Sequence, residues 1–272
     1  MLGKLLKHEF KYSAKRFVPI YIAYCAAGLL IRIVMLVLGM DEVFGESSNI
    51  SNPALDLALT MSFIVLFIAF VFGAIGLLLY AIFGNVSRFH KNLFTDEGYL
   101  MNTLPVPSHS HILCKLISGL VWYAVTFVIV LAGVALAFGD IDSFKIFPYG
   151  IFNELFGDGW AYTLITYVLG IVTYSAFLLL CYMGEGISSM MGGKKGIAAL
   201  TIIVALILNS IVSTLISTLV LSGIGLGSYD SIYDLGDNYL VVYGVRLLYY
   251  TLVSIALFFL TNLIIKEHLN LE

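Results

Sequence analysis

The chain has 272 residues, of which 60% are hydrophobic and only 11% are charged, and its mean hydropathy is +0.99. Soluble domains carry about 45–50% apolar and about 25% charged residues, so this composition excludes an ordinary soluble fold. The 14 basic and 17 acidic residues give a net charge of −3, which is too acidic for a nucleic-acid-binding protein. The composition therefore indicates an integral membrane protein.

Six long apolar stretches account for most of the chain. A bilayer core about 30 Å thick needs about 20 helical residues, and stretches of this kind lie at residues 17–39, 57–84, 113–138, 160–183, 197–222 and 240–265. The connections lack the alternating pattern of a membrane β-barrel. We therefore expect an all-α polytopic membrane protein with six transmembrane helices, forming a single domain over residues 1–272.

The basic residues are distributed unevenly between the two sides of the membrane. Six spans place both termini on one side, which receives 11 of the 14 Lys and Arg residues, while Arg32 and Arg246 fall inside spans. The positive-inside rule therefore predicts that both termini are cytoplasmic. The outer connections are acidic. This acidity either attracts cationic substrates or only reflects the exclusion of Lys and Arg from translocated loops.

Residues 1–16 form a basic amphipathic segment ahead of the first span. One helical face carries Leu2, Leu5, Leu6 and Phe10, and the opposite face carries Lys4, Lys7, Lys11 and Lys15. This pattern predicts a helix on the inner membrane surface, with its lysines at anionic headgroups. Such a helix serves either as an anchor or as an element on which another protein pushes.

Motifs for catalysis and metal binding are missing from the sequence. Gly192-Gly193-Lys194-Lys195 lacks the spacing and the hydroxyl of a P-loop, and His8-Glu9 lacks the second histidine of a zinc protease motif. His109 and His111 have no neighbouring carboxylate in the sequence, and two histidines alone make a poor metal site. We therefore expect no enzyme activity, no metal and no cofactor on this chain.

Polar side chains within the spans are candidates for a transport pathway. Arg32 and Arg246 each lie in the outer half of a span, and either snorkel to the headgroups or line an outer cavity. A polar stripe on the fifth span either joins helices or lines a pathway, and it consists of Asn209, Ser210, Ser213, Thr214, Ser217 and Thr218. No Asp, Glu or Lys sits centrally in a span, which weakens the case for an ion-coupled secondary transporter.

The connection at residues 85–112, between the second and third spans, contains a predicted short cytoplasmic helix. Thr95 or Asp96 is a suitable N-cap, and Pro105 ends the helix. Its apolar side chains either dock in a groove of a partner protein or lie flat on the membrane, and they are Phe94, Tyr99, Leu100 and Leu104.

The run from Phe94 to Ser108, followed by Leu113-Cys-Lys115-Leu116, resembles a segment of the ABC-2 type permeases. In that segment a glutamate, a glycine and a leucine-rich stretch precede proline, valine, a hydroxyl residue and a lysine-led helix. The basic opening from Met1 to Lys11 is similar to that of small permeases of this class from Gram-positive bacteria.

This resemblance implies the permease subunit of an ATP-binding-cassette exporter with the type V fold, in the bacterial cell membrane. Residues 1–16 would be its connecting helix. Asp96 to Leu104, with Glu97 as the polar contact, would be the coupling helix that docks on a separate subunit holding ATP and Mg²⁺. A second permease subunit, identical or related, would complete the pathway. The outer loop at residues 223–239 is shorter than in the larger branches of the family.

Two other functions remain open from the sequence. A non-transporting membrane scaffold or peptide-immunity protein would work without an ATPase partner. A secondary transporter would instead depend on the proton gradient.

Overall fold

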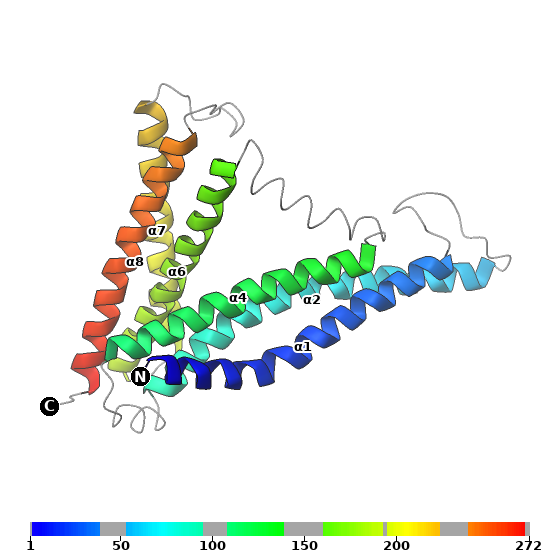
Figure 1. Ribbon diagram of the computed structural model, residues 1–272, viewed down its shortest axis with the longest axis horizontal. Helices are drawn as coiled ribbons and strands as arrows, with labels where there is room; N and C mark the ends of the chain where they lie inside the picture. The colour runs from blue at the N-terminus through cyan, green and yellow to red at the C-terminus, as the bar shows by residue number, and fades with distance from the viewer. Residues whose placement is uncertain are drawn as a thin grey trace. The chain divides into compact units, whose positions relative to one another are not determined.

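The computed structural model describes residues 2–38, 53–94, 108–138, 160–192, 195–223 and 239–269. These ranges contain the helices α1 (Leu2–Leu38), α2 (Pro53–Phe94), α4 (Ser108–Phe138), α6 (Trp160–Met190), α7 (Lys195–Gly223) and α8 (Tyr239–Leu269) (Figure 1). All six are long and apolar enough to cross a membrane. The prediction of an all-α protein with six apolar spans is confirmed, and the chain is a multi-pass membrane protein.

Several helices extend beyond the apolar stretches that predict them. The predicted second span ends at residue 84, whereas α2 continues to Phe94. Residues 2–16 are the first turns of α1, continuous with the first span, and the structure does not show them as a separate surface helix. Pro19 lies inside α1 and has no amide hydrogen for the Lys15 carbonyl, and Figure 1 shows α1 bending after its first turns.

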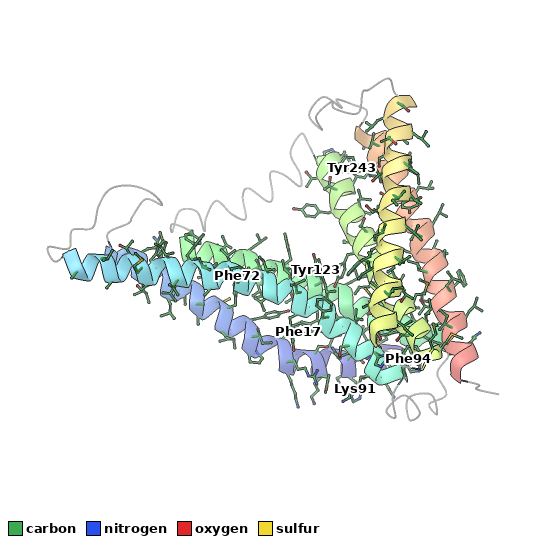
Figure 2. The ribbon with its side chains drawn as sticks, turned by 180° about the vertical axis from the view of Figure 1, so that it is seen from behind. Phe17, Phe72, Lys91, Phe94, Tyr123 and Tyr243 are labelled. Carbon is green, nitrogen blue, oxygen red and sulfur yellow. The ribbon has the colours of Figure 1, made fainter. Side chains whose placement is uncertain are left out.

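The outward surfaces of the helices are strongly apolar. Phe72 on α2 is 68% exposed and Leu219 on α7 is 70% exposed, and many other large aliphatic side chains face outward with them. Figure 2 shows Phe72 on the outside of its helix. Lipid chains are a compatible surrounding for such surfaces, as expected for helices that cross a membrane.

The described chain divides into two compact units. Unit 1 comprises Met1–Leu2, Gly84–Leu120 and Phe152–Glu272, and unit 2 comprises Gly3–Phe83 and Val121–Ile151. The division falls within α2 and within α4. Unit 1 therefore contains α6, α7 and α8 together with the end of α2 and the start of α4, and unit 2 contains most of α1 and the remainder of α2 and α4.

Aromatic side chains build the core of unit 2. The Phe17 ring stacks on Trp122, with 4.9 Å between the ring centroids, and Tyr24 stacks on Phe70 at 4.6 Å. Large flat rings bury much apolar area and add a specific stacking geometry. These two stacked pairs join α1 to α4 and to α2.

Two glycines bring the α1 and α4 backbones close together in unit 2. A Cβ atom added to Gly28 would lie 2.8 Å from the Gly133 carbonyl oxygen, and one added to Gly133 would overlap the Tyr24 ring. Small residues at such crossings are typical of membrane helix packing, because dispersion contacts replace the hydrophobic effect there.

Unit 1 has a separate core in which α2 and α4 pack on α6. The Phe89 and Tyr182 rings stack with their centroids 4.0 Å apart, and both side chains are fully buried. Leu93 and Ile112 are buried in the same cluster. The last turns of α2 and the first turns of α4 are therefore anchored to α6.

The close crossing in unit 2 gives a stability prediction. Gly28→Ala places a methyl group against a backbone carbonyl and is expected to destabilise the protein by about 1–3 kcal/mol, as overpacking does. The measurement is thermal unfolding of the purified protein in detergent. Gly76→Ala on α2 is the control, because a Cβ there meets nothing within 4 Å. Equal stability of the two variants would contradict the assigned crossing.

Candidate functional site

A line of three hydrogen bonds joins α7 to α8 within unit 1. All three donors come from α8: Arg246 Nε donates to Ser217 Oγ at 3.0 Å, the Tyr250 hydroxyl donates to Ser213 Oγ at 3.1 Å, and the Tyr249 hydroxyl donates to Asn209 Oδ1 at 2.9 Å. We call this line the α7–α8 ladder. It covers about two turns of α7, where its members are four residues apart, and about one turn of α8.

The ladder uses only one side of the polar stripe on α7. Ser210, Thr214 and Thr218 are exposed on the unit, and Thr214 Oγ1 donates to the Ser210 carbonyl oxygen of its own helix at 2.8 Å. Of the two interpretations of the stripe, helix packing therefore holds for Asn209, Ser213 and Ser217. The exposed side makes no contact of this kind with α8.

A cavity of about 130 Å³ lies between α6, α7 and α8, beside the ladder. Its lining residues are Thr173, Ala176, Phe177 and Leu180 on α6, Leu206 and Asn209 on α7, and Tyr250 and Val253 on α8. Ala176, Asn209 and Val253 stand at the middle of their candidate spans, Thr163–Met190, Gly196–Gly223 and Leu240–Lys266. The cavity therefore lies midway along the three candidate spans.

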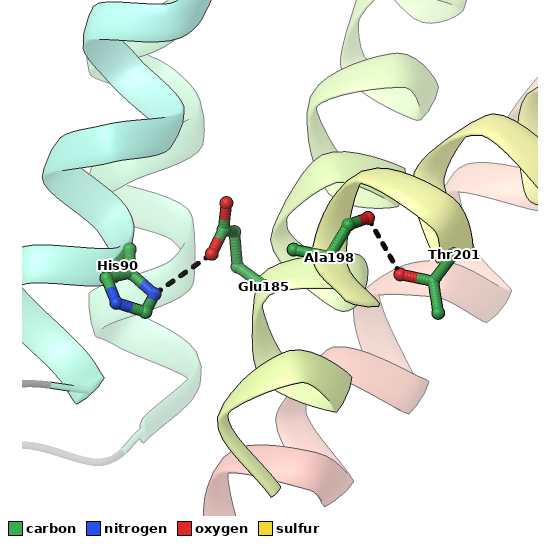
Figure 3. Close-up of polar contacts among 4 residues, drawn as sticks. All are labelled: His90, Glu185, Ala198 and Thr201. Atoms are coloured by element: carbon green, nitrogen blue, oxygen red, sulfur yellow. Dashed lines mark hydrogen bonds and ion pairs between the residues drawn. The ribbon is translucent and has the colours of Figure 1, made fainter. Parts of the chain in front are cut away.

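Two polar groups in this cavity lack hydrogen-bond partners among the described residues. The Asn209 carbonyl oxygen accepts from Tyr249, which leaves the amide nitrogen without an acceptor. The Thr173 hydroxyl also makes no hydrogen bond within the described part of unit 1. Thr201 on α7 differs, because its hydroxyl donates to the Ala198 carbonyl oxygen at 2.9 Å (Figure 3).

A second polar cluster lies where α2 and α4 pack on α6. His90 Nδ1 is 2.9 Å from Glu185 Oε2 (Figure 3). With its amide nitrogen turned toward Arg88, Asn92 donates to the Arg88 carbonyl oxygen at 3.3 Å and accepts from Lys115 Nζ at 2.7 Å. Arg88 and Lys115 are only 8% and 6% exposed. Two basic residues that the sequence places in the cytoplasm are thus buried within unit 1.

α6 ends in a tight turn directly after this cluster. Gly192 has a φ of 88°, a left-handed conformation that glycine adopts without strain. The Met191 amide donates to the Ile187 carbonyl oxygen at 3.1 Å and the Gly192 amide donates to the Ser189 carbonyl oxygen at 3.2 Å. The Gly-Lys segment that fails the P-loop pattern therefore begins in the turn at the C-terminal end of α6.

The structure distributes the predicted site residues over several places. Asn209, Ser213, Ser217 and Arg246 come together in the ladder, whereas Thr214 points away from it. Arg32 is partly buried in α1 and belongs to unit 2. The roles of these residues in a pathway stay predictions.

Most of the predicted coupling helix lies outside the described residues, including Asp96, Glu97, Tyr99, Leu100 and Leu104. Phe94 is described, and it is the last residue of α2. Its ring is partly buried against the unit 1 core, 5.9 Å from the Phe89 centroid. The role of this segment in docking a partner stays a prediction.

Four residues of these clusters were missed by the sequence analysis. Tyr249 and Tyr250 follow Arg246 at helical spacing, so a search of the last span for a polar stripe matching that of the fifth would have found them. Glu185 and His90 are distant in sequence, and no pattern in either segment indicates that they form a pair.

Comparisons with known proteins assign the chain to no family. No family model matches the chain, and searches of curated proteins and solved structures find no match either. In the described ranges, no three His, Cys, Asp or Glu side chains gather closely enough to hold a metal ion.

The α7–α8 ladder gives a second stability prediction. Ser217→Ala removes the acceptor of a charged donor at a buried position, and we expect a loss of about 0.6–1.7 kcal/mol, the range for hydrogen bonds between membrane helices. Thermal unfolding in detergent measures this loss. The matched control is Ser222→Ala on the same helix, where an exposed hydroxyl donates only to the Leu219 carbonyl. A Ser217 variant as stable as the control would contradict the ladder.

Proposed function

We propose that this chain is the permease subunit of an ATP-binding-cassette exporter, and that it moves a hydrophobic or amphipathic substrate out across the bacterial cell membrane. A separate subunit supplies ATP hydrolysis, and a second permease subunit, identical or related, completes the pathway. The six apolar helices and the ABC-2-like run from Phe94 to Leu116 support this proposal. The carrying observation is that the described turns flanking residues 95–107, the end of α2 and the start of α4, belong to the same unit as the central cavity.

The packing of unit 1 connects the helix ends that flank this segment to the helix that lines the cavity. Leu93 at the end of α2 and Ile112 at the start of α4 are buried in one cluster with Tyr182 of α6. The Tyr182 hydroxyl also donates to the Lys115 carbonyl oxygen at 3.4 Å. In this proposal a push that moves the end of α2 and the start of α4 is transmitted to α6 at Tyr182.

The same stretch of α6 reaches the cavity within a short distance. Leu180 and Phe177 line the cavity, and they precede Tyr182 by less than two helical turns. Because close-packed interiors transmit displacement, movement of α6 at its end changes the shape of the cavity. In this proposal the ATPase subunit drives that movement.

One observation favours a second candidate function, a proton-coupled secondary transporter. Glu185 and His90 form an ionisable pair, and Glu185 lies within the candidate span Thr163–Met190. Carboxylate and histidine side chains in membrane spans form the proton relays of many transporters. Glu185 is close to the end of its span, so the exporter remains our proposal.

The docking of residues 95–107 is tested by two substitutions. Glu97→Arg reverses the charge of the predicted polar contact, and Tyr99→Ala removes an apolar contact of the predicted coupling helix. We expect each to abolish recovery of a P-loop ATPase in a mild-detergent pull-down from native membranes, and to abolish substrate-stimulated ATP hydrolysis in the eluate. His109→Ala is the control, because His109 is exposed at the start of α4. Unchanged recovery and hydrolysis in both variants would refute the docking assignment.

The energy source separates the two candidate functions. In vesicles containing the complex, efflux of a fluorescent amphipathic dye is expected to require ATP and to persist with a protonophore. Glu185→Gln keeps the size of the side chain, and we expect it to leave the ATP requirement in place. Efflux that collapses with the protonophore and needs no ATP would establish the secondary transporter instead.

A further inference from the structure

The size of the cavity between α6, α7 and α8 limits what it can hold. Its volume is about 130 Å³. An engineered apolar cavity of roughly 150 Å³ binds benzene. The cavity therefore accommodates a group of about benzene's size, such as a small ring or a short branched chain.

The lining of the cavity excludes a charged occupant. Apart from Thr173, Asn209 and Tyr250, the lining side chains are aliphatic or Phe, and none carries a charge at neutral pH. An ion at the centre of a membrane protein needs a counter-charge or many hydrogen bonds. The occupant must therefore be neutral.

The polar groups of the cavity specify one more property of the occupant. The Asn209 amide nitrogen and the Thr173 hydroxyl can each donate, and neither has an acceptor among the described residues. The Tyr250 hydroxyl is already engaged with Ser213. An unpaired donor in an apolar surrounding costs free energy, and a ligand atom that accepts a hydrogen bond removes this cost.

We propose that this cavity is a binding site for a small, neutral, apolar group that carries a hydrogen-bond acceptor, with a carbonyl oxygen as the representative acceptor. Asn209 donates to the acceptor, and Phe177, Leu206 and Val253 surround the apolar part. The proposal deepens the proposed function, on which it rests, because it gives the chemistry of the substrate.

The test uses two probes of equal shape on the purified full chain in lipid nanodiscs. Fluorobenzene fills the cavity without an acceptor, and 3-fluoropyridine replaces one C–H by an accepting nitrogen and is neutral at pH 7. Saturable changes in the ¹⁹F NMR signal, compared with empty nanodiscs, report binding. We expect both probes to bind the unmodified chain.

Substitutions of lining residues separate the contribution of the Asn209 hydrogen bond to binding from that of the apolar lining. Asn209→Leu is expected to weaken 3-fluoropyridine roughly fivefold to tenfold, as the loss of one hydrogen bond does, and to leave fluorobenzene unchanged. Ala176→Phe and, separately, Val253→Phe fill the cavity and are expected to abolish binding of both probes. Asn209→Leu also breaks the bond that the Tyr249 hydroxyl donates to Asn209 Oδ1. Tyr249→Phe is the control, because it breaks that bond and leaves the lining of the cavity unchanged.

Two results would overturn the proposal. One is the absence of saturable binding of either probe to the unmodified chain. The other is equal weakening of both probes by Asn209→Leu. The assay contains no ATPase, so its failure is distinguishable from failure of the exporter proposal, which the pull-down tests.

The same assay distinguishes two sources of the acceptor. An ester carbonyl of a membrane lipid would compete with 3-fluoropyridine in diester nanodiscs, and the affinity would then rise in diether nanodiscs. A transported molecule as the natural occupant predicts equal affinity in both.

Discussion

The hydrocarbon core of a bilayer offers no hydrogen bonds, so each polar atom inside it must find a partner within the protein. Most hydroxyls in the described spans meet this requirement locally. Thr126 and Thr261, for example, donate to the carbonyl oxygen four residues earlier in their own helices. The three longer side chains of α8 cannot do so, and they bond across to α7. In the central cavity the Asn209 amide nitrogen and the Thr173 hydroxyl do not meet this requirement among the described residues.

The two polar clusters of unit 1 differ in what holds them. The ladder consists of neutral acceptors with one cation among the donors, at positions that the bilayer surrounds. The second cluster keeps Arg88 and Lys115 almost fully buried, and its His90–Glu185 pair joins α2 to α6. Buried charges tolerate few alternative arrangements, because losing a partner is costly. This cluster lies in the turns of α2 and α4 that flank the segment that we propose to receive force.

The sequence predicted the helices well because the signal for a membrane span is local and long. Twenty apolar residues in a row leave few alternatives to a helix. The same analysis could not decide between the two interpretations of the α7 stripe, because the answer depends on which neighbour faces Ser213 and which side stays exposed. The pairing of His90 with Glu185 was missed for the same reason. The predicted coupling helix lies outside the described residues, so it rests on the sequence pattern alone.

The way α7 is held bears on how the central cavity could open. None of the residues in its most apolar 18-residue window is fully buried, and there α7 packs on the unit 1 core through partly buried side chains such as Ile202, Ala205 and Leu206. Hydrogen bonds between membrane helices are worth about 0.6–1.7 kcal/mol each, so the ladder supplies roughly 2–5 kcal/mol. A change of about 5.5 kcal/mol is enough to reverse a two-state equilibrium from 1:99 to 99:1. Because the ladder is of this size and α7 lies beside a cavity with unpaired donors, a ligand, or a push transmitted through α6, can displace α7.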